Sequence, residues 1–276
     1  MAVVINTNIP SISATRSLHE ANSSLSQAME RLSSGKRING AKDDAAGMTV
    51  VTRMKAQITS LNQAVRNAND GISLLSTYDG AADEIETILI RMRELATLSQ
   101  NATYTDEDRT NANLEYSQLT SEITRIHQRT KFNGQLEISS GGGAQAYSIQ
   151  VGFTASDSVS LSLGSLEASA LSNGGFQAVS LAASAVNEVS KIDNALTELN
   201  AGRAQVGAHI NRLEHTVSNL MNVIQRTEEA RSRIEDADFA AESAALARAN
   251  VLTQAGSAML AQANQAPQYV LTLLRS

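Results

Sequence analysis

Apolar residues recur along this chain with an alternating spacing of four and three positions. The longest unbroken run comprises Gly47, Val51, Met54, Ile58, Leu61, Val65, Ala68, Ile72 and Leu75. This spacing is typical of a coiled-coil seam, in which long helices pack side by side. After Leu75 the pattern slips by one position and resumes at Tyr78, next to Asp79-Gly80. The slip predicts a local change in winding or a short break.

A second long seam lies nearer the other end of the chain. It comprises Ala185, Val189, Ile192, Leu196, Leu199, Arg203, Val206, Ile210, Leu213, Val217, Leu220 and Ile224. Its one polar member, Arg203, either sets the register or extends its charged group to water, and we favour the second role. A shorter seam at 112–126 follows Thr105–Asp108, whose first and fourth residues resemble a capping box. These seams predict a mainly α fold, a long antiparallel coiled-coil helical rod.

Residues 132–176 differ in pattern from the rest of the chain. The stretch opens on the turn dipeptide Asn133-Gly134, contains a run of three glycines at 141–143, and then alternates apolar and polar residues from Tyr147 to Phe153. Such alternation indicates a β-hairpin. Because long helices flank it, we expect a small hairpin that caps the bundle.

Both ends of the chain also carry seams, but of small residues. They comprise Ala14, Leu18, Ala21, Leu25, Ala28 and Leu32 at the front, and Ala245, Ala249, Leu252, Gly256, Met259, Ala263 and Ala266 at the back. At about 25 cal/mol per Å², such narrow stripes do not offset the roughly 1–2 kcal/mol needed to order each residue. We therefore expect the ends to be disordered in the free monomer and to fold, pairing as an inner coiled coil, on assembly. The apolar stretch 269–274 needs a partner.

Composition narrows the possible functions. The 276 residues carry a net charge of −6 with no basic block, which excludes a broad nucleic-acid surface. No stretch approaches the ~18 consecutive apolar residues of a membrane span. The first thirty residues lack the pattern of a cleavable secretory signal, so export would need another route.

No candidate chemistry stands out. There is no Cys, and His19, His127, His209 and His215 show no metal-ligand spacing, so we expect no metal or cofactor. Asp43 and Asp44 precede an Ala-rich helical run, where carboxylates cap helix amides rather than catalyse. An enzyme is the weakest interpretation because no nucleophile, base and ligand set converges.

Several long motifs resemble the terminal regions of bacterial flagellins, in the same order and at similar spacing. They are RLSSGKRINGAKDDAAGM at 31–48, NDGISLL at 69–75, IRMRELATLSQN at 90–101, KFNG at 131–134 and SRIEDADFAAESAALARANVLTQAGSAMLAQANQAPQYVLTLLRS at 232–276. The resemblance covers about 1–140 and 180–276. It implies a structural subunit that polymerises head-to-tail into the extracellular flagellar filament used for swimming, without outer variable domains.

The resemblance also implies a division of the chain and a set of partners. Residues 1–42 with 233–276 would form an inner domain, and 43–232 a helical rod with the hairpin region. The partners would be further copies of the chain, the flagellar type III export apparatus, an export chaperone on the C-terminal segment, and the filament cap and junction proteins.

Three groups of residues follow as candidate sites. The inner-core assembly residues would be Leu18, Leu25, Leu32, Leu252, Met259, Leu271 and Leu274, and the rod seam would centre on Val51, Ile58, Leu61, Ile72, Leu196, Ile210, Leu213 and Leu220. Arg91, Leu95 and Glu115 lie in stretches that resemble the rod surface gripped by the vertebrate Toll-like flagellin receptor. The same residues could instead serve subunit contact, which is the safer interpretation.

Two other functions remain as alternatives. A filament-junction protein of the same organelle would share the terminal heptads, and a cytoplasmic coiled-coil scaffold would share the long seams. The motifs RINGAKDDAAGM and ANQAPQYVLTLL favour the filament subunit. Digestion with trypsin would distinguish a flagellin-like subunit from a scaffold, because only the flagellin-like monomer should lose both termini.

Overall fold

Five long helices and two short antiparallel strand pairs make up the described structure. The computed structural model describes residues 7–133, 136–137, 145–154, 156–164, 166–167, 171, 175–178 and 182–275, and their side chains except at 136–137, 145, 182–184 and 266–275. The helices are α1 (Ile9–Ser34), α2 (Ala45–Gln100), α3 (Asp106–Arg129), α5 (Ala182–Glu235) and α6 (Phe239–Arg275). The strands β1 (Lys131–Phe132) and β2 (Leu136–Glu137) form one pair, and β3 (Gln145–Gln150) and β4 (Ser158–Leu163) the other. The predicted fold class is confirmed.

The chain divides into two compact units. One combines residues 1–58 with 225–276, and the other comprises residues 59–224. The first unit holds α1 and α6 with the adjoining ends of α2 and α5, and the second holds α3, the strands and the remainder of α2 and α5. The domain boundaries at 42 and 233 that the sequence suggested stay a prediction.

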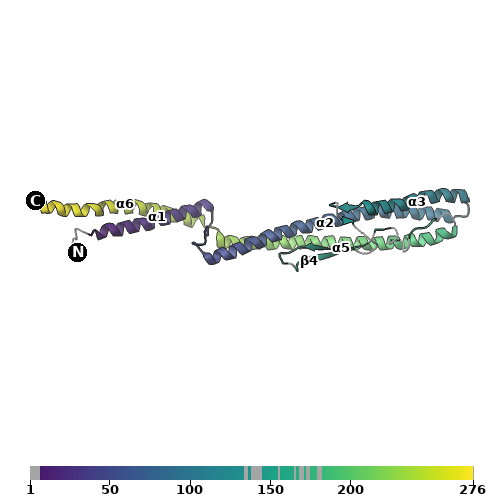
Figure 1. Cartoon of the computed structure of the whole chain (residues 1–276), viewed down its shortest axis with the longest axis horizontal. Helices are drawn as coiled ribbons and strands as arrows, with labels where there is room; N and C mark the ends of the chain where they lie inside the picture. The colour runs from purple at the N-terminus through teal and green to yellow at the C-terminus, as the bar shows by residue number, and fades with distance from the viewer. Residues whose placement is uncertain are drawn as a thin grey trace. The chain divides into compact units, whose positions relative to one another are not determined.

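The core of the unit 59–224 lies between α2, α3 and α5, which run side by side (Figure 1). Of the predicted seam residues, Leu213 is fully buried in this core, and Ile72, Leu196 and Ile210 pack against it at partial exposure. Leu61 and Leu220 are buried in a separate small cluster with Ala64. In the other unit, Val51 and Ile58 are buried.

Helix α2 runs without interruption through the predicted slip. It is helical from Ala45 to Gln100, so of the two alternatives predicted at Asp79-Gly80 the short break is wrong, and the local change in winding stays a prediction. Tyr78, Ala81 and Ala82 on either side of Gly80 are buried. Because a glycine costs a helix only about 0.5–1 kcal/mol, burial of these neighbours outweighs it.

The predicted start of α3 is confirmed in detail. The backbone N–H of Asp108 donates to Thr105 Oγ1 at 3.3 Å, and the backbone N–H of Thr105 donates to Asp108 Oδ2 at 3.0 Å. This reciprocal pair is a capping box, and it satisfies two amides that a helix end otherwise leaves without partners.

The β3–β4 hairpin lies along the helices rather than capping the bundle, which corrects our expectation. Its strands pair Tyr147 with Leu161 and Ile149 with Val159, and the inward face of β4 is buried in the main core. On α2, the Asn67 side chain donates to the Gln150 carbonyl at 3.0 Å, well inside the helix. Gly71 leaves room for the hairpin, since a Cβ there would lie 3.3 Å from Ile149 Cγ1. The alternating pattern predicts a buried face but not which surface buries it.

Tyr78 joins the hairpin to the helices through its hydroxyl group. The side chain is 1% exposed, and its hydroxyl donates to the Gly164 carbonyl at 2.9 Å. Gly164 and Gly202 leave the space for this group, because a Cβ on either would lie 3.4 Å from the hydroxyl oxygen. Burial, together with the negative charge of Asp79, raises the pKa of Tyr78 to about 12.

We expect this buried hydroxyl to make the subunit sensitive to alkali. Because the folded pKa exceeds the unfolded value near 10, the neutral hydroxyl of Tyr78 contributes its full stabilisation of the fold below about pH 10. This stabilisation, about 3 kcal/mol, is lost as pH rises towards 12. Thermal unfolding followed by circular dichroism from pH 9 to 12, with tyrosinate absorbance, measures the loss. Burial raises the pKa of Tyr116 as well, so Tyr78→Phe should lessen the pH dependence without removing it. An unchanged dependence in Tyr78→Phe contradicts the prediction.

Candidate assembly surface

The terminal helices α1 and α6 pair antiparallel but bury few apolar side chains between them (Figure 1). Within the described part of these helices, Ala21, Ala28 and Ala249 are the buried apolar residues. Each is small, so the hydrophobic contribution of the pair is limited. Large apolar residues on the same helices stay exposed: Ile9, Ile12, Met29, Phe239, Val251, Leu252 and Met259.

The seam of α6 that faces α1 differs by one position from the predicted seam. Leu246, Ala249, Thr253, Gly256, Leu260 and Ala263 are buried or half-buried. The predicted members Ala249, Gly256 and Ala263 belong to this face, whereas Leu252 and Met259 lie outside it, at 52% and 65% exposed. Small residues occur in the predicted set of positions and in the observed one. The sequence alone therefore did not separate the face of α6 that meets α1 from the face left open.

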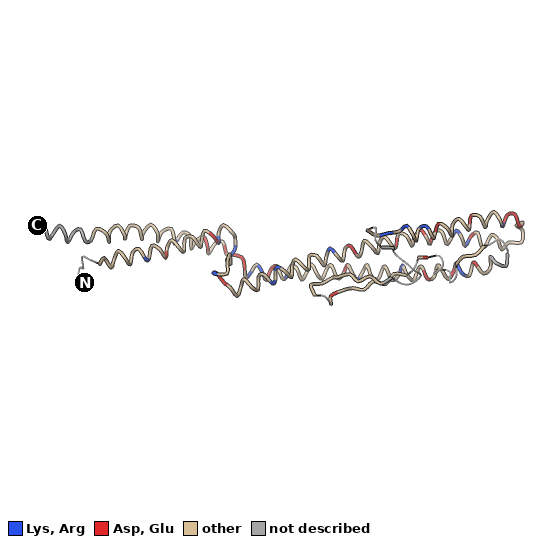
Figure 2. Tube along the Cα trace, viewed as in Figure 1, with Lys and Arg blue, Asp and Glu red and all other residues tan. Residues whose placement is uncertain are grey.

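The open face borders a groove of about 720 Å³ between the two helices. Leu252 and Met259 line it on α6. The other lining residues are Pro10, Ser13, Ala14, Ser17, Glu20, Ala21, Ser24, Ala255 and Gly256. The lining is almost uncharged, and α6 carries no Asp, Glu, Lys or Arg between Arg248 and Arg275. The described part of that stretch is correspondingly tan throughout in Figure 2. An uncharged face with large exposed apolar residues is typical of an interaction site.

The remaining predicted inner-core residues are three half-buried leucines of α1 and two leucines near the end of α6. Leu18, Leu25 and Leu32 of α1 are half-buried, and the Leu18 side chain approaches Gly256, where a Cβ would lie 3.3 Å from Leu18 Cδ1. The side chains of Leu271 and Leu274 lie outside those that the structure describes. The role of these seven residues in assembly stays a prediction.

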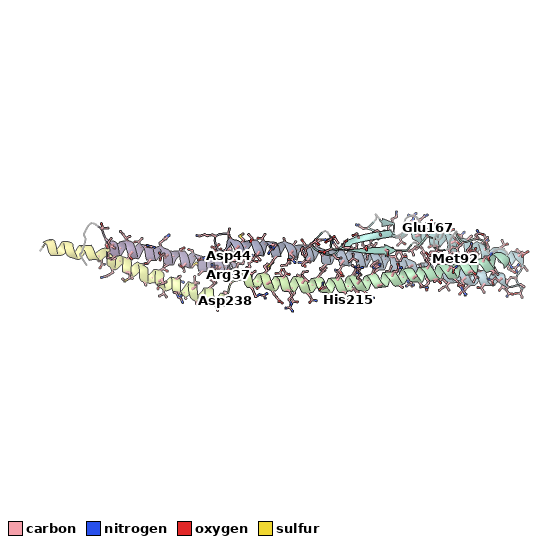
Figure 3. The ribbon with its side chains drawn as sticks, turned by 90° about the horizontal axis from the view of Figure 1, so that it is seen from below. Arg37, Asp44, Met92, Glu167, His215 and Asp238 are labelled. Carbon is pink, nitrogen blue, oxygen red and sulfur yellow. The ribbon has the colours of Figure 1, made fainter. Side chains whose placement is uncertain are left out.

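Polar contacts join the link after α1 to the link between α5 and α6. The Arg37 backbone N–H donates to the Glu235 carbonyl at 2.7 Å, and Ala237 N–H donates to the Gly35 carbonyl at 3.0 Å. Arg37, labelled in Figure 3, also donates through its guanidinium to the Ile234 carbonyl at 2.7 Å. Lys36 forms an ion pair with Glu235. These contacts hold the two links together although about 200 residues separate them.

Asp44 caps the start of α2, which confirms its interpretation as a capping residue, whereas Asp43 binds amides of the turn before that helix. Asp43 Oδ2 accepts from the N–H groups of Asn39 and Gly40 at 3.0 and 3.1 Å, and these bonds lower the pKa of its carboxyl group. Asp44 Oδ1 accepts from Gly47 N–H at 2.8 Å, at the start of α2. A helix start leaves amides such as that of Gly47 without partners, and Asp44 supplies one.

Of the three residues predicted for a contact surface on the rod, Arg91 and Glu115 are exposed, and their role in contact stays a prediction. Arg91 is exposed and forms ion pairs with Glu115 at 2.8 Å and Glu94 at 2.9 Å, which raise the pKa of its guanidinium. Leu95 is 4% exposed and belongs to the core, so its placement on this surface is corrected. It occupies a helix position turned towards the bundle, next to Ala96 of the predicted seam.

Two charged clusters escaped the sequence reasoning. Arg203 on α5 pairs with three acids of α2, reaching Asp79 at 2.9 Å, Asp83 at 3.1 Å and also Glu86. The side chain is partly exposed and held by carboxylates, so it does more than extend to water. Glu188, also on α5, is buried at 2% exposure and accepts from the Tyr116 hydroxyl at 3.1 Å.

The described residues offer no metal site and no membrane span. Across these ranges no group of three or more His, Asp or Glu side chains is placed to hold a metal ion. Nor does any helix in the described ranges combine the length and hydrophobicity that a membrane crossing requires.

Comparisons with known proteins agree on one family. The bacterial flagellin N-terminal helical region matches residues 5–141, and the bacterial flagellin C-terminal helical region matches residues 189–274. The chain is 43% identical over 274 residues to the flagellin of Halalkalibacterium halodurans, covering 99% of this chain and 100% of that protein. It is 38% identical over 285 residues to a flagellar filament core protein of Brachyspira hyodysenteriae, covering 99% and 100%. A crystal structure of Bacillus cereus flagellin is 33% identical, with a TM-score of 0.49, over 56% of this chain and 88% of its own.

Proposed function

The chain belongs to the bacterial flagellin family, and from this premise we propose that its paired terminal helices are the elements through which subunits assemble. The protein is a structural subunit of the extracellular flagellar filament that serves swimming motility. The family consists of structural proteins rather than enzymes, and we assign this chain no catalytic role. Its first partner is a further copy of itself.

The exposed apolar face of the α1–α6 pair carries the proposal. Leu252 and Met259 are more than half exposed and line a groove whose one charged lining residue is Glu20. Covering them in an assembly removes their apolar surface from water, at about 25 cal/mol per Å². A subunit whose complementary surfaces differ extends into an open helix when the rotation does not close. On family grounds, residues 1–42 with 233–276 would form the inner part of the filament, and 43–232 the surrounding rod.

The scarcity of burial in the α1–α6 pair supports folding on assembly. Its buried apolar residues are alanines in the described part of the chain, which is little against an ordering cost of about 1–2 kcal/mol per residue. We therefore keep the proposal that both ends are disordered in the free monomer and order in the filament. Trypsin should then remove both ends from the monomer and leave the filament intact.

The further partners are proposed on family grounds. An export chaperone would hold the C-terminal segment, the type III apparatus would carry the chain outward, and the cap and junction proteins would bound the filament. For the surface around Arg91 and Glu115 we propose subunit contact, with a host Toll-like receptor as a second candidate. The ion pairs of Arg91 with Glu94 and Glu115 give this surface a defined charge pattern.

Seeded elongation tests the assembly proposal. Purified intact chain and a chain truncated to 43–232 are incubated with short filament seeds and examined by electron microscopy. We expect the intact chain alone to elongate seeds, because truncation removes the groove entirely. Circular dichroism of the truncated chain controls for loss of the helical rod. Elongation by the truncated chain, or by neither chain, rejects the role of the terminal helices.

A further inference from the structure

Pro267 interrupts the hydrogen bonding of α6. In an α-helix the carbonyl of each residue accepts from the N–H four positions later. Proline has no backbone N–H, so the carbonyl four residues before it loses its regular donor. Helix α6 continues through this position to Arg275, and the carbonyl concerned is that of Ala263.

The side chain of Asn8 supplies the missing donor. Its Nδ2 donates to the Ala263 carbonyl oxygen at 2.8 Å. At the same time its Oδ1 accepts from Ser11 N–H at 3.1 Å, which caps the start of α1. Because one end of the amide group must donate and the other must accept, these two bonds fix its orientation. Next to it, Ser11 Oγ donates to Asn264 Oδ1 at 2.8 Å.

Apolar packing between α1 and α6 does little to fix their register. On α1, small and large residues repeat every seven positions as Ala14, Ala21, Ala28 and as Leu18, Leu25, Leu32. On α6, Ala249, Gly256 and Ala263 repeat at the same interval. A slip of one heptad therefore sets small residues against similar small residues. Polar contacts must then distinguish the registers, as a single asparagine does in some coiled coils.

We propose that Asn8 is a register-specifying residue of the filament subunit, matched to the carbonyl that Pro267 leaves without a donor on α6. The inference rests on the proposed function of the α1–α6 pair in assembly. In a register shifted by seven residues, Asn8 no longer meets Ala263, and that carbonyl loses its partner. At the opposite end of the pair, Arg31 Nη1 lies 3.1 Å from Glu242 Oε1 and favours the same register.

Engineered disulfides report the register directly, because the chain contains no cysteine. A Cβ at Gly256 would lie 3.7 Å from Leu18 Cβ, within the usual range for a disulfide. The pair Leu18→Cys with Gly256→Cys therefore reports the observed register. Leu18→Cys with Ala249→Cys, or with Ala263→Cys, reports a slip of one heptad in either direction.

The register is measured in filaments grown from seeds, oxidised and separated on non-reducing gels, with links within a chain distinguished from links between chains. We expect the 18–256 link to dominate in the parent chain. Asn8→Asp keeps the size of the side chain and the cap acceptor but removes the donor. It should raise the proportion of slipped links about tenfold.

If Asn8 compensates for the donor that Pro267 lacks, the effect of Asn8→Asp on the link ratio must depend on Pro267. Pro267→Ala restores a backbone donor to the Ala263 carbonyl, so adding Asn8→Asp in that background should change the link ratio little. The inference is overturned if Asn8→Asp leaves the ratio of slipped to observed links unchanged, or changes it equally with and without Pro267. Filament growth in that experiment would still support the proposed function. Failure of the parent chain to elongate seeds overturns the proposed function, and this inference with it.

Discussion

Replacing Leu252 and Met259 together by aspartate is expected to stop filament elongation while leaving the subunit folded. Both side chains are more than half exposed in the subunit and line the groove of the α1–α6 pair. If a neighbouring subunit covers them, each carboxylate is buried without a partner, at a cost of several kcal/mol. Because each 1.4 kcal/mol is about tenfold in an equilibrium constant, the critical concentration should rise at least ~100-fold.

The measurement is seeded elongation by electron microscopy and sedimentation across a range of subunit concentrations. Leu252→Met and Met259→Leu together form the matched control, since they keep the apolar surface and nearly the same volume. We expect that control to elongate like the parent chain. Thermal unfolding of the aspartate variant should match the parent, because neither position contributes to the core. An unchanged critical concentration would show that this face stays in contact with water in the filament.

The long helices and their seams were predictable because the signal is local. Spacing of four and three positions identifies which residues share a helix face, and residues such as Leu61, Leu213 and Leu220 are buried as that spacing requires. The capping box of α3 was predictable for the same reason, since Thr105 and Asp108 are three residues apart. The continuous helix at Asp79-Gly80 was not, because it depends on burial of neighbouring residues by other elements.

The one-position error on α6 has a physical origin. Two frames of small residues run along this helix, and Ala249, Gly256 and Ala263 belong to both. Periodicity finds the helix but does not choose between Leu252 and Thr253, or between Met259 and Leu260, as the face that meets α1. That choice depends on the rotation of α6 about its own axis, which the spacing of small residues along the sequence does not fix.

The Arg203 cluster left a sequence signal that was overlooked. Its partners Asp79, Asp83 and Glu86 are spaced by four and three positions, so they form an acidic row on one face of α2. An arginine at a seam position of the facing helix is the complement of such a row. Glu188 left no comparable signal, because Tyr116 lies 72 residues away on another helix.

Glu188 is expected to be the most costly polar side chain to remove from the rod. Its carboxylate accepts from the Tyr116 hydroxyl and the Gln177 N–H, each at 3.1 Å, and pairs with Lys191 Nζ at 2.9 Å. It thereby joins α3 and α5 to the chain around Gln177. Burial, together with the charge of Glu188, raises the pKa of the Tyr116 hydroxyl. The bond is therefore between a neutral phenol and a carboxylate.

Glu188→Ala should destabilise the subunit by about 3–5 kcal/mol, because it leaves the phenol, the amide and the ammonium group without their acceptor. For a chain of this size the melting temperature should fall on the order of 10 °C, measured by circular dichroism at neutral pH. Glu188→Gln keeps an acceptor and the side-chain volume, so its effect should be smaller. Glu198→Ala, at an exposed position of the same helix, should stay within about 0.5 kcal/mol of the parent. Equal melting temperatures for Glu188→Ala and Glu198→Ala would mean that the buried carboxylate contributes no more than a surface one, and that apolar packing alone joins α3 to α5.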